Sequence, residues 1–127
     1  METRIADDHD RRYKYLFSHP GFVERLFTSF VDEPFVKQLD FSTLERVKAS
    51  FVSEEFARRE ADVIWKVSFQ GRPIYLFLLI EFQSSVDRWM ALRFLRYLAE
   101  FYQSLVVEGQ TAPLPAVFPL LLYSGDP

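Results

Sequence analysis

The sequence predicts an α/β domain in which a helical opening is followed by three strands, a long helix and a last strand. Residues 62–69 alternate between apolar and polar side chains, and residues 74–80 form an uninterrupted apolar run. Apolar residues between Ser84 and Gly109 recur at helical spacing. Alternation with a period of two indicates a strand, whereas spacings of three and four indicate a helix. We expect one domain over residues 1–127, because this length suffices to bury one core.

The opening element is expected to be a helix or a broken pair of helices over residues 8–32. Acidic residues precede the apolar ones, as is favourable at a helix N-terminus. The apolar side chains at helical spacing are Tyr13, Leu16, Phe17, Phe22, Val23, Leu26, Phe27, Phe30 and Val31. Pro20 and Gly21 interrupt this pattern.

Three strands are expected next. Residues 47–51 are the first candidate, and in residues 62–69 the apolar Val63, Trp65 and Val67 fall on one face. The run over residues 74–80 is apolar throughout, which is typical of a strand covered on both faces.

The four residues Gln70 to Pro73 are expected to close an antiparallel hairpin in which Phe69 pairs with Ile74. On that register Asp62 lies opposite Glu81, with Cβ atoms about 5 Å apart. Two carboxylates so close repel each other and lose hydration unless a cation or proton joins them. Mg²⁺ favours such oxygen ligands, so the pair predicts a magnesium site suited to phosphodiester hydrolysis. The alternative is that each acid marks a strand end, and a one-residue slip would separate them.

The second half of the chain is expected to hold a helix and a strand. Ser84 and Asp87 resemble a capping box. The apolar residues that follow at helical spacing are Val86, Met90, Phe94, Tyr97, Leu98, Phe101 and Leu105. The apolar stretch over residues 116–123 is read as the last strand.

The acidic residues and their neighbours resemble a known family. Asp62, 18 intervening residues and then Glu81-Phe82-Gln83 are similar to the D…(D/E)xK nuclease pattern, with Gln83 in the lysine position. Further matching residues are His9-Asp10, Tyr13-Lys14, Leu16-Phe17-Ser18, Pro20, Ile80-Glu81-Phe82-Gln83-Ser84-Ser85, Met90, Arg93 and Tyr97. Together they resemble the recombination-promoting nuclease or putative transposase family of bacteria over nearly the whole chain.

This resemblance implies a PD-(D/E)XK nuclease with a restriction-endonuclease-like αβββαβ core, a mixed sheet flanked by helices. It also implies magnesium-dependent DNA cleavage, in which Mn²⁺ can substitute for Mg²⁺. Asp62 and Glu81 would be metal ligands, joined by the backbone carbonyl of Phe82. Gln83 would orient the attacking water or hold a phosphate oxygen.

Two departures from the family pattern stand out. Phe82 occupies a position where the family often has His, and members usually continue beyond the point where this chain ends. The chain is therefore expected to be the N-terminal part of a longer protein.

Asp10 is either a third carboxylate of the site or a charge that complements a helix dipole.

DNA contact is assigned to a set of arginines. The candidates are Arg58, Arg59, Arg88, Arg93 and Arg96. Glu100 shares the polar arc of the helix with Arg96, so a solvated face is the competing interpretation. The formal net charge of −3 gives no support to phosphate binding, so any basic patch must be local.

Several chemistries are excluded by composition and spacing. The chain has no cysteine, which rules out disulfides and thiolate zinc sites. His9 and His19 lack an acid at ligand spacing, and no catalytic serine triad or glycine-rich phosphate loop can be specified. No apolar run is long enough to cross a membrane, so we expect a soluble protein. Because a chain without cysteine loses nothing in a reducing compartment, we expect it in the cytoplasm.

The leading hypothesis is a metal-dependent DNA endonuclease linked to recombination or transposition. The alternative is a catalytically inactive module that keeps the fold and binds DNA or a protein partner, because Gln83 replaces the usual lysine. An interaction domain without nucleic acid is a third hypothesis. A homodimer would suit strand exchange or double-strand cutting.

Overall fold

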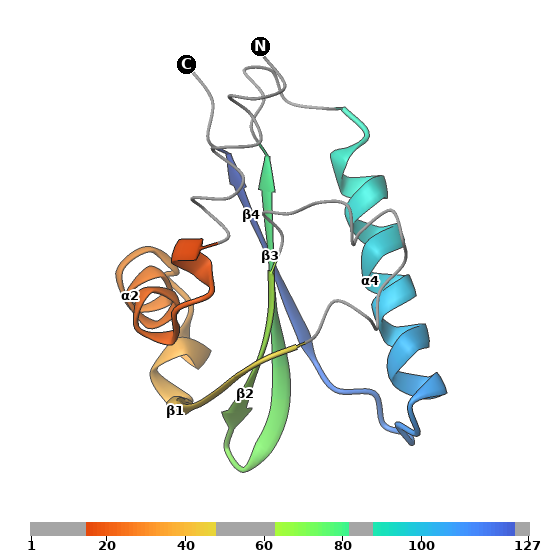
Figure 1. The fold of residues 1–127 in the computed structure, drawn as a ribbon, viewed down its shortest axis with the longest axis horizontal. Coiled ribbons are helices and arrows are strands. Elements are labelled where there is room, and N and C mark those ends of the chain that lie inside the picture. The colour runs from red at the N-terminus through yellow and green to blue at the C-terminus, as the bar shows by residue number, and fades with distance from the viewer. Residues whose placement is uncertain (1–14, 48–62, 82–87, 124–127) are drawn as a thin grey trace.

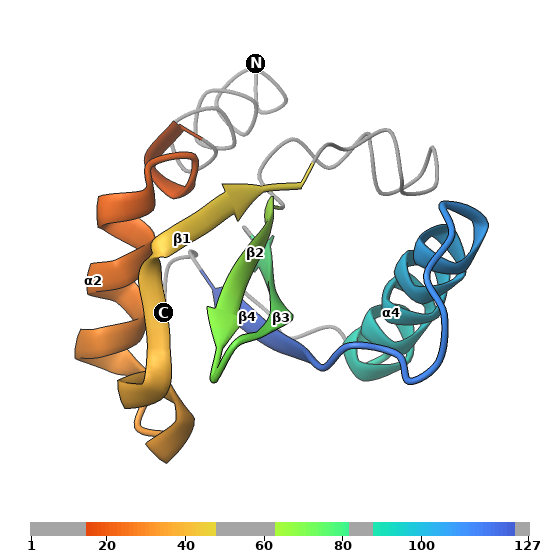
Figure 2. The same cartoon turned by 90° about the horizontal axis from the view of Figure 1, so that it is seen from below.

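The computed structural model describes residues 15–47, 63–81 and 88–123 of the chain. Its elements are α2 (Pro20–Phe30), the 3-10 helix η1 (Pro34–Gln38), β1 (Leu39–Arg46), β2 (Val63–Phe69), β3 (Arg72–Glu81), α4 (Met90–Val107) and β4 (Val117–Tyr123). The two α-helices cover opposite faces of one sheet (Figures 1 and 2). This is an α/β fold.

The sheet has four strands in the order β1-β2-β3-β4. β1 and β2 pair antiparallel, as do β2 and β3, whereas β3 and β4 pair parallel. A parallel neighbour requires a crossover connection, and α4 lies within that connection. The mixed sheet with flanking helices confirms the predicted restriction-endonuclease-like arrangement.

The hairpin between β2 and β3 is tighter than the sequence suggested. Phe69 pairs with Arg72, so the expected pairing of Phe69 with Ile74 is wrong. The loop consists of Gln70 and Gly71 alone, with φ of 51° and 80°. Two central residues with positive φ form the turn type that best matches the twist of a hairpin. The register therefore shifts by two residues, which leaves the assignment of side chains to faces unchanged.

The first strand also differs from expectation. It spans Leu39–Arg46, whereas the sequence placed it at residues 47–51, of which residues 48–51 lie outside the described part. β1 was missed because its pairing with β2 shifts register between Asp40 and Glu45. Within that irregularity the Thr43 Oγ1 accepts a 2.8 Å hydrogen bond from the Ser68 N–H. A side chain thus replaces a backbone acceptor, which weakens the alternation in the sequence.

The helical predictions hold where the chain is described. Residues 15–17 are helical, the chain turns at Ser18, and α2 starts at Pro20, a residue favoured in the first turn. The opening is therefore a broken pair in this part, while residues 8–14 lie outside it. α4 begins at Met90, and the capping box expected at Ser84 lies outside the described residues.

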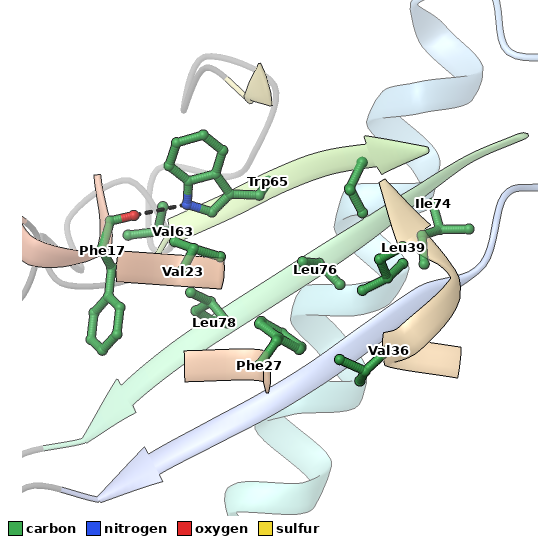
Figure 3. Packing of buried hydrophobic residues seen from close by; sticks show 11 residues of the cluster. Phe17, Val23, Phe27, Val36, Leu39, Val63, Trp65, Ile74, Leu76 and Leu78 are labelled. Carbon is green, nitrogen blue, oxygen red and sulfur yellow. Dashed lines mark hydrogen bonds between the residues drawn. The ribbon is translucent and has the colours of Figure 1, made fainter. Parts of the chain in front are cut away.

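The face of the sheet toward α2 carries one buried cluster (Figure 3). Val23 and Phe27 of α2 pack there with alternate residues of β2 and β3, including Trp65 and Leu76. The Trp65 Nε1–H donates a 2.8 Å hydrogen bond to the carbonyl of Phe17. This bond ties the segment before α2 to the second strand.

The face toward α4 carries a second cluster, built around aromatic rings. Phe101 of α4 meets Tyr75 with ring centroids 5.0 Å apart, and Phe94 meets Phe77 at 5.6 Å. Leu76 to Leu79 of β3 are all fully buried, divided between the two clusters. The expectation that this strand is covered on both faces is confirmed.

β4 lies at the edge of the described sheet and contains Pro119. The carbonyl of Ala116 accepts a 3.0 Å hydrogen bond from the Tyr75 N–H, so alternate residues from Ala116 onward turn toward β3. Pro119 falls in the other set and faces the open edge. Because proline has no N–H, this edge is poorly suited to accept another strand.

Candidate active site

The candidate site lies where the two parallel strands end. Glu81 is the last residue of β3 and pairs with Tyr123, the last residue of β4. The start of α4 lies at the same end of the molecule (Figure 1). Ligand sites of open α/β sheets form outside the carboxyl ends of parallel strands. The fold therefore places Glu81 at an edge suited to binding.

The backbone beneath this edge is held firmly. Residues 74–79 of β3 are buried, toward α2 on one face and toward α4 on the other. Backbone pairing continues to the last residue of β3 through the ladder with β4. A group at the end of such a strand is held by packing and by the hydrogen-bond ladder, which is the support that a preorganised site requires.

Of the predicted ligands, Glu81 alone lies in a described element. Asp62, Phe82, Gln83 and Asp10 lie outside the described residues. Within the described ranges, no three His, Asp or Glu residues group so that they could hold a metal ion. The predicted metal ligands therefore stay predictions.

The observed register changes the argument for the carboxylate pair. Val63, the first residue of β2, pairs with Leu78, and Glu81 lies three residues further along β3. The direct opposition of Asp62 and Glu81 was predicted from a four-residue loop, and the observed two-residue loop removes the basis for it. The shift is an even number of residues, so the expectation that both positions share a face does not depend on that error.

The predicted DNA-contacting arginines are distributed along and before α4. Arg88 is exposed just before the helix, and Arg93 is half-buried within it. The Arg96 Nε lies 3.3 Å from an oxygen of Glu100 one helical turn later. Such a pair is an ordinary feature of a solvated helix surface. Arg58 and Arg59 lie outside the described residues.

Sequence reasoning missed Arg46, the last residue of β1. Its Nη1 donates a 2.6 Å hydrogen bond to the hydroxyl of Ser18, and burial lowers the pKa of its guanidinium. Arg46 pairs with Trp65, whose indole is bonded to Phe17. Nothing in the local sequence singles out this arginine, because β1 was itself not recognised. The residue fastens the first helical segment to the sheet.

A hollow of about 490 Å³ lies at the other end of β3. Phe69, Ile74 and Pro115 are among the residues that line it, and its surface is mainly apolar. It is formed by the β2–β3 hairpin and the loop before β4, far along the strand from Glu81. This hollow therefore takes no part in the candidate site.

None of the helices in the described ranges has both the length and the apolar character needed to cross a bilayer.

The mixed four-stranded sheet, its two covering helices and the acid at the end of β3 define a protein with a restriction-endonuclease-like core. The model of one family, described as putative transposase, YhgA-like, matches residues 7–127. The chain belongs to this family, which confirms the resemblance stated from the sequence.

Curated relatives cover almost the whole chain. Recombination-promoting nuclease RpnC of Escherichia coli K12 is 31% identical over 99% of this chain and 42% of its own length. RpnD of Escherichia coli O157:H7 is 30% identical over 93% of this chain and 45% of its own length. The inactive recombination-promoting nuclease-like protein RpnE of strain K12 is 29% identical over 98% of this chain and 42% of its own length.

The chain thus spans less than half the length of these relatives. The names place it among nuclease-family proteins that include members described as inactive. No solved structure matches the chain.

Proposed function

We propose that this chain carries the catalytic core of a metal-dependent DNA endonuclease that acts in recombination or transposition. The single observation that carries the proposal is the position of Glu81. It ends a strand buried on both faces, beside a parallel partner, in a chain whose relatives are named recombination-promoting nucleases.

In this proposal Asp62 and Glu81 supply carboxylate ligands for Mg²⁺, with the backbone carbonyl of Phe82 and, from the first segment, Asp10. Carboxylate and carbonyl oxygens are the donors that Mg²⁺ and Mn²⁺ prefer. The bound ion would lower the pKa of a water molecule that attacks phosphorus. Gln83 would orient that water through its amide group.

A neutral amide at position 83 separates this site from one that carries lysine. Glutamine can accept and donate hydrogen bonds but cannot neutralise a phosphate oxygen. Positive charge for DNA would then come from arginines, with Arg88 the exposed candidate beside the start of α4. We therefore expect binding that weakens steeply with added salt.

The competing function is a nuclease-fold module without catalysis that binds DNA or a protein partner. Two observations favour it: the glutamine at position 83 and the similarity to RpnE, which is described as inactive. The two functions differ in whether the carboxylates bind metal.

Calorimetric titration with Mn²⁺ and a plasmid-nicking assay with Mg²⁺ test the proposal on the same protein. We expect Mn²⁺ binding and nicking in the unaltered chain, and loss of both in Asp62→Asn and Glu81→Gln. Glu24→Gln is the matched control, because it removes an exposed carboxylate from α2 and should change neither.

Retained DNA binding without Mn²⁺ binding, in a chain that unfolds cooperatively, would establish the inactive module. Nicking that persists in chelator, or in both carboxamide variants, would overturn the metal assignment. Circular dichroism of each variant separates loss of metal binding from loss of fold.

A further inference from the structure

The outer face of α4 carries an apolar stripe that the sheet does not use. Leu92 and Leu95 are 60% and 61% exposed, and Val106 is 53% exposed. The outer seam of α4 consists of Leu92, Leu95, Ala99, Tyr102 and Val106. Tyr102 forms its margin, because this side chain is half-buried and its hydroxyl donates a 2.8 Å hydrogen bond to the carbonyl of Pro115. These positions alternate in steps of three and four, the spacing by which one helix packs against another. The buried residues of the same helix lie on the opposite side.

α2 shows what a helix with a solvated outer side looks like in this protein. Its exposed residues include Glu24, Arg25 and Thr28, with one exposed aromatic residue at its end, Phe30. The outer seam of α4 differs because its apolar residues are contiguous along the helix. Contiguous exposed apolar surface marks an interaction site.

From this seam we propose that α4 pairs antiparallel with α4 of a second copy of the chain, across a twofold axis at Ala99. Leu92 and Val106 each lie seven residues from Ala99. An antiparallel neighbour would therefore set Leu92 against Val106 of the second copy, and Val106 against its Leu92. On this axis Leu92, Ala99 and Val106 match one another, as a twofold interface requires. Leu95 would lie opposite Gln103 of the second copy, and Tyr102 opposite its Arg96.

Ala99 suits the crossing point. It is exposed and has the smallest side chain of the seam. Helices approach to about 8 Å where the residues at the contact are small. The larger side chains on either side of Ala99 would then pack into the partner helix.

The charges of α4 favour the antiparallel direction. Arg88, Arg93 and Arg96 lie before or within its first half, whereas Glu100 and Glu108 lie in or just after its second half. This order opposes the helix dipole, which favours acids near the N-terminus and bases near the C-terminus. An antiparallel copy brings the acidic half of one helix beside the basic half of the other. A parallel copy would bring like charges together.

The sheet edge is a poorer surface for self-association. β4 is the outer strand of the described sheet on that side, and Pro119 removes a backbone donor from the middle of its open edge. The helix face is thus a better interface than the β4 edge. This inference does not depend on the proposed nuclease function, because it is tested without DNA or metal.

Sedimentation equilibrium across a range of concentrations is the first test. We expect the mass to rise with concentration toward twice the 15.0 kDa of one chain. The double variant Leu92→Glu, Leu95→Glu should remain at the single-chain mass while it keeps its helical circular dichroism, because both side chains are exposed. Phe30→Glu, at an 81% exposed position on α2, should dimerise like the unaltered chain.

Cysteine cross-linking tests the direction. The chain contains no cysteine, so a single introduced thiol can form a disulfide only with its copy. We expect oxidised Ala99→Cys to give a covalent dimer and Val106→Cys to remain monomeric. Efficient cross-linking of both would indicate parallel helices and overturn the proposed arrangement. A single-chain mass at every concentration would overturn the proposal.

Discussion

Both helices pack a ring on the sheet, as Phe27 of α2 does against Phe118, but the contacts that accompany this packing differ. On the α2 side, polar bonds fasten the preceding segment to the strands: Trp65 to the carbonyl of Phe17, and Arg46 to the hydroxyl of Ser18. On the α4 side, aromatic rings carry the contact, with Phe101 packed edge-on against Tyr75. Polar bonds fix the position of a short segment, whereas ring packing contributes buried area along a long helix.

The outer faces of the two helices differ as well. The outer face of α2 is mainly polar and is therefore suited to contact with solvent. One side of α4 packs on the sheet, and the other side exposes the apolar outer seam. α4 is therefore the helix that can join the core to a partner. If Glu81 is catalytic, the start of α4 would connect that partner with the active end of the sheet (Figure 1).

The largest expected effect is the loss of a ring beneath α4. Phe101→Ala removes a fully buried side chain, and such truncations cost about 3–5 kcal/mol of unfolding free energy. Val107→Ala on the same helix changes a residue that is 78% exposed and should stay within about 0.5 kcal/mol. Urea denaturation measures both, and equal midpoints would contradict the packing on this face.

A smaller effect is expected on the α2 side. Trp65→Phe keeps a ring in the cluster but removes the indole hydrogen bond to the carbonyl of Phe17, and the loss of one such bond costs about 0.5–1.5 kcal/mol. Trp89→Phe alters an indole that is 62% exposed and serves as the control. If the two variants had the same denaturation midpoint, the indole bond would have no role in fixing the first segment.

The smallest expected effect is a dependence of the unfolding free energy on pH, which arises from tyrosines on the α4 side of the sheet. Burial, with a contribution from Glu45, raises the pKa of Tyr75 above its ordinary 10.0, and burial also raises the pKa of Tyr102. Their contribution to stability is therefore complete below pH 10 and is lost as the pH rises through the folded-state pKa values, because the unfolded chain ionises first.

The unfolding free energy should thus fall above pH 10, and Tyr75→Phe should make that fall shallower. Thermal unfolding at a series of alkaline pH values measures the slope. A slope that steepens or stays the same in Tyr75→Phe would show that the buried phenol is not its source.

The long periodic elements could be read from the sequence. β2 alternates as predicted, β3 is buried on both faces, and α4 and β4 fall within the ranges expected for them. β1 could not be predicted from alternation. Its pairing with β2 shifts register, and the hydroxyl of Thr43 takes the place of a backbone acceptor. The hairpin register failed at Gln70, a non-glycine residue with positive φ that sequence preference does not favour.

The candidate site also combines features that are visible in the sequence with features that only the fold decides. Its residue types and spacing are visible in the sequence, and the family match agrees with the resemblance drawn from them. That Glu81 ends a strand with a parallel partner is a fact of the fold. Parallel pairing joins residues far apart in the chain, which local patterns cannot specify.

By itself the sequence determined which segments are apolar on one face, which are apolar on both, and that Glu81 stands at the end of a strand, because these properties depend on spacing along the chain. Only the tertiary structure decided the two-residue hairpin loop, the contact of Arg46 with Ser18 and the exposure of the outer seam of α4. These depend on which surfaces meet, and α4 has two apolar sides of which the sheet covers one.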